Sequence, residues 1–243
     1  MNHTVTYSSD ITVELVKHSA ADSDVIFAAR VSTQGERAEG ANTGETITAD
    51  SKNAGLINFL MRERHGTPFE HSYLTFYVKA PIFVWREHMR HRIASYNEES
   101  GRYRQLDPEF YLPERDRKLV QVGKPGAYEF EDGSNNQYAL TVTAARQTCE
   151  FAYQEYLKLL MNGVAREVAR MVLPVNIYSS AYVTLNARSL MNFLSLRQNV
   201  EGQMFPSYPQ REIEMVAEQY EQVFAKLMPL THESFIKNGR VAP

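Results

Sequence analysis

The chain has 243 residues, a formal net charge of −3, 43% hydrophobic residues and a single cysteine, Cys149. Its length allows a sizeable core, and its composition is ordinary for a globular enzyme. The weak net charge argues against a generic nucleic-acid binder, and one cysteine excludes an internal disulfide, a four-cysteine zinc site and a CxxC redox pair. No signal-like or membrane-spanning apolar run is present, so we expect a cytoplasmic protein without a membrane partner.

Loop, strand and helix patterns follow one another in the first half of the chain. The polar stretch 33–51 predicts a surface loop. Leu74, Phe76 and Val78 alternate with more polar residues, which predicts a strand over 72–80. Pro81 suits the first position of a helix, which we expect over 82–91. A second polar stretch, 114–136, predicts another surface loop.

The second half of the chain is mainly helical. Apolar residues at steps of three and four predict a long helix over 136–161. Cys149 lies on its apolar stripe, which favours a core role over a nucleophilic one. Alternation predicts a strand over 175–185, followed by a helix over about 187–197 and a C-terminal helix that includes residues 213–227. The mixture predicts an α+β fold with one catalytic domain over 1–243.

Arginine is concentrated in one short segment. Five of the 18 arginines lie within residues 86–104, where no lysine occurs although the chain has eight. A guanidinium can bind a carboxylate, a phosphate or the edge of a heterocycle with two parallel hydrogen bonds. Arg86 and Arg90 stand four residues apart, as do Arg166 and Arg170, so each pair would place like charges on one helix face. Together they predict a site for a phosphate-bearing ligand.

Several common motifs are missing. The chain has no GxGxxG, no P-loop and no GxSxG sequence, so a nucleotide would have to be held by arginines and helix ends. Four of the seven histidines lie between residues 65 and 91, but their spacing does not fit a HExxH zinc site. His91 also stands between two arginines, which would repel a cation. We therefore expect no metal.

The segment Arg90-His91-Arg92-x-x-Ser95-x-Asn97-Glu98-x-Ser100-x-Arg102 resembles the signature of the flavin-dependent thymidylate synthases. Residues 64–71, 166–174 and 186–193 resemble the family too, and the resemblance runs from about residue 10 to 235. It implies a single mixed α/β domain with a central, mostly antiparallel sheet flanked by helices. It also implies methylation of dUMP to dTMP, with 5,10-methylenetetrahydrofolate as carbon donor, FAD as cofactor and NADPH as reductant. The implied assembly is a homotetramer with shared active sites.

The resemblance also assigns site residues. Arg197 resembles the catalytic arginine that binds the uracil edge and favours its N3-deprotonated form, and His65 resembles a histidine near the flavin and folate. The implied dUMP contacts are Glu87, Arg90, Glu98, Glu99, Ser100, Gly101, Arg102, Arg170 and Arg197. The implied FAD contacts are Thr67, Arg90, His91, Arg92, Asn97, Glu98, Asn186, Arg188 and Asn192.

Two positions depart from the family pattern. Glu87 stands where some relatives have glutamine, and the segment 198–209 is longer than usual, with Tyr208 nearest to the place of an expected histidine. Two other interpretations stay open. A non-catalytic nucleotide-binding homologue would keep the arginines without the chemistry. An RNA-binding module would use them on a phosphate backbone, with a steep dependence of binding on salt.

Overall fold

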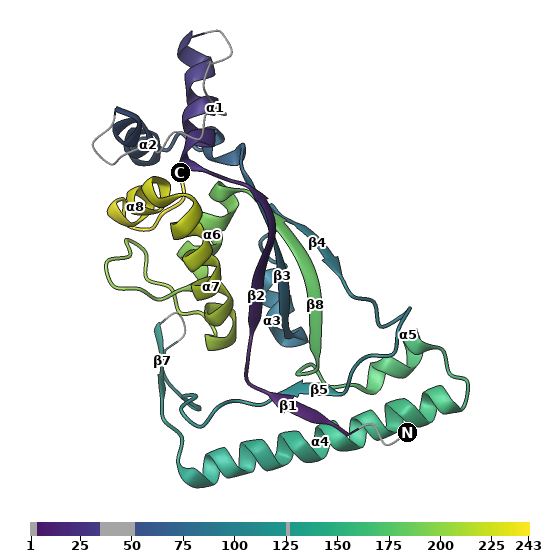
Figure 1. Ribbon diagram of the computed structural model, residues 1–243. Helices are drawn as coiled ribbons and strands as arrows, with labels where there is room; N and C mark the ends of the chain where they lie inside the picture. The colour runs from purple at the N-terminus through teal and green to yellow at the C-terminus, as the bar shows by residue number, and fades with distance from the viewer. Residues whose placement is uncertain (1–3, 35–51, 125–126) are drawn as a thin grey trace. The chain divides into compact units, whose positions relative to one another are not determined.

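The computed structural model describes residues 4–34, 52–124 and 127–243 (Figure 1). The chain divides into two compact units. Unit 1 comprises residues 1–12, 79–88 and 97–181, and unit 2 comprises residues 13–78, 89–96 and 182–243. A single domain over 1–243 stays a prediction. In the described ranges, no helix is long and apolar enough to cross a membrane.

The central sheet has four strands in the order β2-β3-β8-β4 (Figure 1). They are β2 (Thr12–Ser19), β3 (Tyr73–Pro81), β8 (Tyr178–Leu185) and β4 (Ser95–Glu98). Leu74, Phe76 and Val78 of β3 are fully buried, as the alternation predicts. The hydroxyls of Thr75 and Thr184 lie 2.8 Å apart and join β3 to β8. The mixed α/β class with a central antiparallel sheet is confirmed.

Unit 1 contains two smaller strand pairs. β1 (Thr6–Ser8) runs parallel to β5 (Glu109–Tyr111), and β6 (Val120–Lys124) is antiparallel to β7 (Ala127–Glu131). The stretch 114–136, predicted as a surface loop, therefore contains a paired hairpin. The helices of unit 1 are α3 (Ile82–His88), α4 (Asn135–Met161), the one-turn α5 (Arg166–Ala169) and the 3₁₀ turn η2 (Arg170–Val172).

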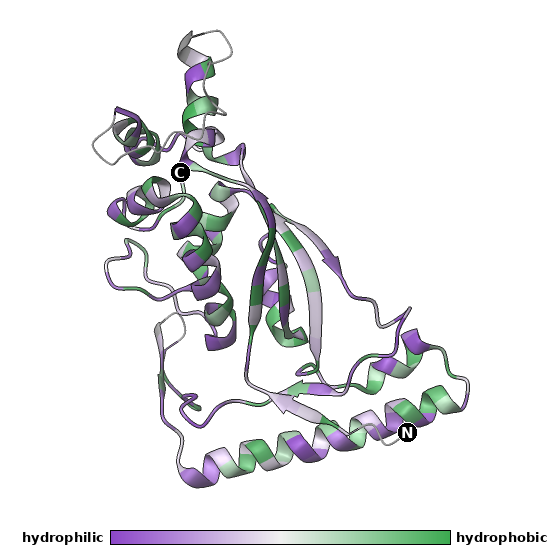
Figure 2. Cartoon of the chain, viewed as in Figure 1, coloured by the Kyte–Doolittle hydropathy of each residue, from purple (hydrophilic) through white to green (hydrophobic). Residues whose placement is uncertain are grey.

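Helix α4 begins at a capping box and buries one face. Ser134 accepts from the Gln137 backbone, and the Gln137 side chain accepts in return from Ser134. Its polar and apolar residues alternate along the length of the helix (Figure 2). Tyr153 donates to the Leu106 carbonyl at 2.9 Å. Cys149 is 1% exposed, and burial raises the pKa of its thiol, so its predicted core role is confirmed.

Unit 2 holds the remaining helices. They are α1 (Asp22–Gln34), α2 (Lys52–Arg62), the 3₁₀ turn η1 (Thr67–Glu70), α6 (Ala187–Arg197), α7 (Arg211–Leu227) and α8 (Pro229–Lys237). Phe76 of β3 and Phe193 of α6 both pack on the Tyr220 ring of α7, at centroid distances of 4.4 and 5.4 Å. Of the predicted loop 33–51, residues 33 and 34 end α1, and 35–51 lie outside the described residues.

Helix α6 matches its predicted span because its first turn is capped. The Asn186 side chain accepts from the Ser189 backbone at 2.8 Å and satisfies one of the unpaired N–H groups at the start of the helix. Helix α8 is capped from a distance. Asp22 is 7% exposed and accepts three hydrogen bonds, from the Leu230 backbone and from the Thr231 backbone and hydroxyl. These contacts hold the first turns of α6 and α8 in unit 2.

Candidate active site

The arginine-rich segment leaves its helix earlier than predicted. Helix α3 ends at His88, and Pro81 is the last residue of β3 rather than the first of the helix. Arg90 therefore lies beyond α3 and does not share a helix face with Arg86, which corrects the prediction of a like-charge pair there. The helix stops because residues 95–98 join the sheet beside β8 as strand β4.

Four arginines of the segment and its neighbourhood are exposed. The side chains of Arg86, Arg90, Arg92 and Arg170 make no hydrogen bond or ion pair with any other described residue. Arginine otherwise tends to pair with carboxylates, as Arg104 does with Glu99 at 3.1 Å and Asp107 at 2.5 Å. Exposed guanidinium groups without a protein partner fit the predicted site for an anionic ligand.

A cavity of about 230 Å³ lies within unit 1. Glu98, Glu99, Gly101 and Arg170 line it, which are four of the nine predicted dUMP contacts, beside apolar residues such as Ile82. Pockets for whole small molecules usually occupy ~300 Å³ or more. The cavity therefore matches part of a nucleotide, and it is too small for a dinucleotide.

Two serines of β8 hold the two carboxylates of this cavity. The Ser179 hydroxyl donates to Glu98 at 2.6 Å, and Ser179 is 4% exposed. The Ser180 backbone donates to Glu99 at 2.9 Å. Sequence reasoning placed both serines in a strand and gave them no role. The serines and the glutamates are 81 residues apart, so no local sequence pattern indicates this contact.

Close packing explains why a glycine stands at position 101, a predicted dUMP contact. A Cβ added at Gly101 would lie 3.2 Å from the Arg170 side chain and from that of Leu106, tighter than ordinary contact. Arg102, a predicted dUMP contact, pairs with Glu167 at 2.8 Å, and both side chains are about half exposed. The Ser100 hydroxyl accepts from the Arg102 backbone at 3.3 Å. Ser100, Gly101 and Arg102 thus form one short turn beside the cavity.

In unit 2, Arg197 is held by a neutral histidine. The Nε of Arg197 donates to Nε2 of His91 at 3.0 Å, and the His91 ring packs 4.5 Å from that of Phe193. Burial, together with the charge of Arg197, lowers the pKa of His91 from 6.5 to about 4. The ring is therefore an uncharged acceptor at neutral pH. His91, predicted as a FAD contact, also orients the predicted catalytic arginine.

The predicted FAD contacts are distributed over both units. Seven lie in unit 2, and Asn97 and Glu98 lie in unit 1. Arg188 donates to the Pro243 carbonyl at 2.6 Å and pairs with Glu70 at 2.5 Å. A Cβ at Gly66 would lie 2.5 Å from the Arg188 guanidinium, so Gly66 makes room for it. Guanidinium and amide donors of this kind fit a pyrophosphate and the acceptor edge of a flavin.

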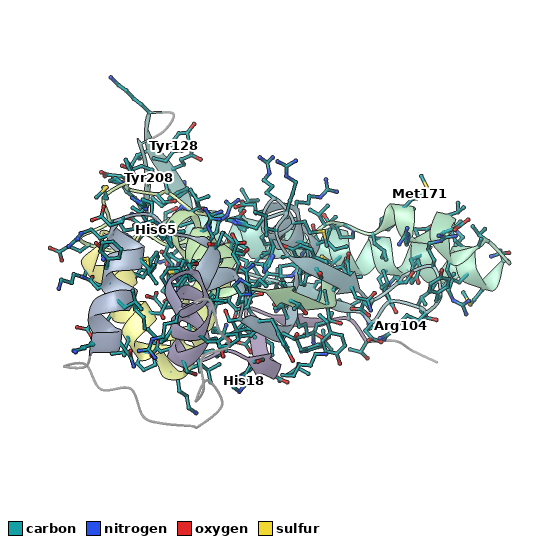
Figure 3. All side chains as sticks on the ribbon, turned by 90° about the horizontal axis from the view of Figure 1, so that it is seen from above. His18, His65, Arg104, Tyr128, Met171 and Tyr208 are labelled. Atoms are coloured by element: carbon teal, nitrogen blue, oxygen red, sulfur yellow. The ribbon has the colours of Figure 1, made fainter. Side chains whose placement is uncertain are left out.

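His65, the second predicted catalytic residue, is exposed and is labelled in Figure 3. Its ring stacks on that of Phe59 at a centroid distance of 5.8 Å. Glu87 is half-buried in α3, and Thr67 opens the turn η1. The segment 198–209, which departs from the family pattern, contains no helix or strand. None of these placements tests the proposed roles, which stay predictions.

Unit 1 thus has a cavity lined by carboxylates and an arginine, and in unit 2 a separate arginine is oriented by a neutral histidine. The family model of the thymidylate synthase complementing proteins matches residues 14–230. The flavin-dependent thymidylate synthase of Tropheryma whipplei (strain TW08/27) is 59% identical over 237 residues, which cover 98% of this chain and 97% of that protein. The enzyme of the same name from Streptomyces avermitilis is 58% identical over 238 residues, covering 98% and 95%. The chain belongs to the flavin-dependent thymidylate synthase family, a family of methyltransferases.

Solved structures agree with this membership. A UMP/dUMP methylase, PolB from Streptomyces cacaoi, was solved with 5-Br dUMP bound. It is 53% identical, covers 98% of this chain and 100% of its own, and superposes with a TM-score of 0.90. The same methylase bound with 5-Br UMP gives 51% identity and a TM-score of 0.89, with 99% of this chain covered.

Proposed function

We propose that this chain catalyses the reductive methylation of dUMP to dTMP. The carbon donor would be 5,10-methylenetetrahydrofolate, the cofactor FAD and the reductant NADPH. The cavity of unit 1 carries the proposal, because it brings Glu98, Glu99 and Gly101, at the end of β4 and in the turn after it, together with Arg170 of η2. Family membership supports the same activity.

Arg197 supplies the activating charge in this proposal. A fixed guanidinium beside the uracil ring stabilises the N3-deprotonated pyrimidine. His91 already holds the Nε of Arg197, so the direction of the fork is set before a ligand binds. The activated ring can then accept carbon at C5 without a cysteine nucleophile. The burial of Cys149 in the core of unit 1 is consistent with this route.

The other residues bind rather than react. Arg90, Arg102 and Arg170 would hold the phosphate by charge-assisted hydrogen bonds. Ser179 keeps the Glu98 carboxylate in one orientation for the nucleotide. FAD, when bound, supplies hydride-transfer chemistry. The guanidinium groups of Arg92 and Arg188 would hold FAD, together with the other predicted FAD contacts.

The test uses FAD-loaded protein, dUMP, NADPH and methylenetetrahydrofolate, with dTMP measured by chromatography. The flavin absorbance should bleach on addition of NADPH, and dTMP should accumulate. Arg197→Ala should lower kcat by about 10²-fold or more, since it removes a charge aimed at the developing anion. Arg197→Lys should recover only part of the loss, because the planar fork is missing. Binding of dUMP without any dTMP would instead support the non-catalytic homologue.

UMP is a second candidate substrate. The similarity to a UMP/dUMP methylase at 51–53% identity favours testing it. Parallel reactions with UMP and dUMP at equal concentration measure the preference directly. Product from dUMP alone would restrict the activity to the deoxynucleotide.

The same proposal includes a homotetramer with shared active sites and a cytoplasmic location. Light scattering of the purified protein tests the assembly, and cell fractionation tests the location. A fully active monomer would contradict the shared sites.

A further inference from the structure

Arg197 is the last residue of α6. The next residue, Gln198, is extended, with φ −134° and ψ 152°. The final turn of a helix has carbonyl groups without helical partners and tends to fray. A guanidinium that must present a fixed fork to a ligand therefore needs support from outside its own helix.

That support comes from Arg240, which lies just after α8. The Arg240 guanidinium is 5% exposed and binds both oxygens of Glu221, at 2.7 and 2.9 Å. Glu221 also lies 2.8 Å from His232. Burial alone would raise the pKa of Glu221, but the bonds from His232 and Arg240 outweigh it and lower that pKa to about 2. The pair is thus charged at neutral pH and anchored between α7 and α8.

Arg240 contacts α6 on both sides of Arg197. Its guanidinium donates to the buried side chain of Gln198, the residue after Arg197. Its carbonyl oxygen lies 2.7 Å from the hydroxyl of Ser195, two residues before Arg197, which shares its hydrogen with the Met191 carbonyl. Arg240 therefore holds Gln198 through its side chain and Ser195 through its backbone carbonyl, one on each side of Arg197.

The backbone of Arg240 is unusual in a way that fits this role. Its φ is +56°, a conformation that non-glycine residues rarely adopt. In addition, its Nε is buried without a hydrogen-bond partner among the described residues. Both features cost free energy. They are compatible with the fold because the bonds to Glu221, Gln198 and Ser195 compensate for them.

We propose that Arg240 is a positioning residue for Arg197, fixing the end of α6 through Gln198 and Ser195. The inference rests on the proposed function, in which Arg197 stabilises the N3-deprotonated pyrimidine. Arg240 is 5% exposed, so in this proposal it acts through Arg197 rather than by contact with the substrate. Its effect should appear in how strongly the site favours an acidic pyrimidine, and only secondarily in the stability of the fold.

The experiment compares dissociation constants of dUMP and 5-fluoro-dUMP on the FAD-loaded enzyme by calorimetry. Fluorine acidifies N3, so a site that stabilises the N3 anion binds the fluoro analogue more tightly, and the ratio of the two constants exceeds one. Arg197→Ala should bring the ratio to one. Gln198→Met keeps the volume and removes the link, and Arg240→Lys keeps the charge and removes the fork. Each of these two variants should lower the ratio towards one. The fall should be at most about tenfold, which corresponds to the loss of one charge-assisted hydrogen bond.

The double variant Arg240→Lys/Gln198→Met should behave like the stronger single variant, because both act through one contact. Asp22→Asn is the matched control: it weakens the cap of α8 without touching Gln198 or Ser195, and it should lower the melting temperature while keeping the wild-type ratio.

If Gln198→Met and Arg240→Lys kept the same ratio as the wild-type protein, the positioning role would be overturned, even if both variants were less stable. An equal fall of the ratio in Asp22→Asn would also overturn it, because the effect would then be general loosening of α8. A wild-type ratio of one would overturn the inference and the role of Arg197 together. A wild-type ratio above one without dTMP formation would refute the proposed activity and leave the positioning measurable.

Discussion

Replacing His91 by glutamine should flatten the acid side of the stability curve of the flavin-free protein. In the wild-type chain, Nε2 of His91 accepts from Arg197 and must be unprotonated to do so. A glutamine oxygen can accept the same hydrogen bond, but glutamine does not titrate. The variant therefore keeps the contact and removes its pH dependence.

The sign and size follow from the pKa of His91, which burial and Arg197 lower from 6.5 to about 4. Between these values the unfolded chain binds more protons than the folded protein, so stability falls as pH falls. Linkage between the two pKa values gives a loss of about 2 kcal/mol from pH 7 to pH 5 through this one group. Below about pH 4 the contribution levels off, because His91 is then protonated in both states.

Urea unfolding of both proteins at half-unit intervals from pH 4.5 to 7.5 measures the effect. All other titrating groups are common to the two proteins, so the difference between their curves isolates His91. We expect that difference to change by about 2 kcal/mol between pH 7 and 5. Parallel curves would refute the reasoning, since they would mean that His91 has the same pKa in both states.

Three further predictions concern stability and nucleotide binding. Asp22→Ala should lower the free energy of unfolding by about 1–3 kcal/mol in urea, because three hydrogen bonds at the start of α8 are lost, and a change near zero would contradict the cap. Ser179→Ala removes the 2.6 Å bond to a cavity carboxylate and should weaken dUMP binding about tenfold by calorimetry; unchanged affinity would mean that the carboxylate needs no such support. Gly101→Ala should press on the Arg170 side chain and weaken dUMP binding, whereas Gly55→Ala, in open space within α2, should leave it unchanged.

Regular elements with strong local signals were predictable from the sequence. Helix α6 has a capping asparagine at its start, and α4 has a capping box and a long apolar stripe. Strands β1, β4 and β5 have too few residues for a period of two to emerge, and they were not predicted. Strand β2 is longer, but it was not predicted either, because most of its side chains are exposed and do not alternate with buried ones. The hairpin of β6 and β7 was concealed within a polar stretch, because its pairing depends on backbone hydrogen bonds rather than on buried side chains.

The candidate site was predictable only in part. The resemblance to the family indicated Glu98, Gly101 and Arg170, which the structure brings to one cavity. It could not indicate Arg240, because the contact with Gln198 joins residues 42 apart and has no local pattern. The end of α3 at His88 was missed for a similar reason, since the competing partner of the following residues is strand β8, far along the chain.

The ion pair between Arg102 and Glu167 makes phosphate binding at this position an exchange reaction. A ligand that recruits Arg102 must replace a carboxylate 2.8 Å away. Because both side chains are about half exposed, the pair contributes only ~0–1 kcal/mol, so a dianionic phosphate displaces it easily. An uncharged nucleoside has no phosphate that could replace the Glu167 carboxylate at Arg102. Under the proposed function, deoxyuridine should therefore compete poorly with dUMP, and discrimination against unphosphorylated precursors is built into the unliganded protein.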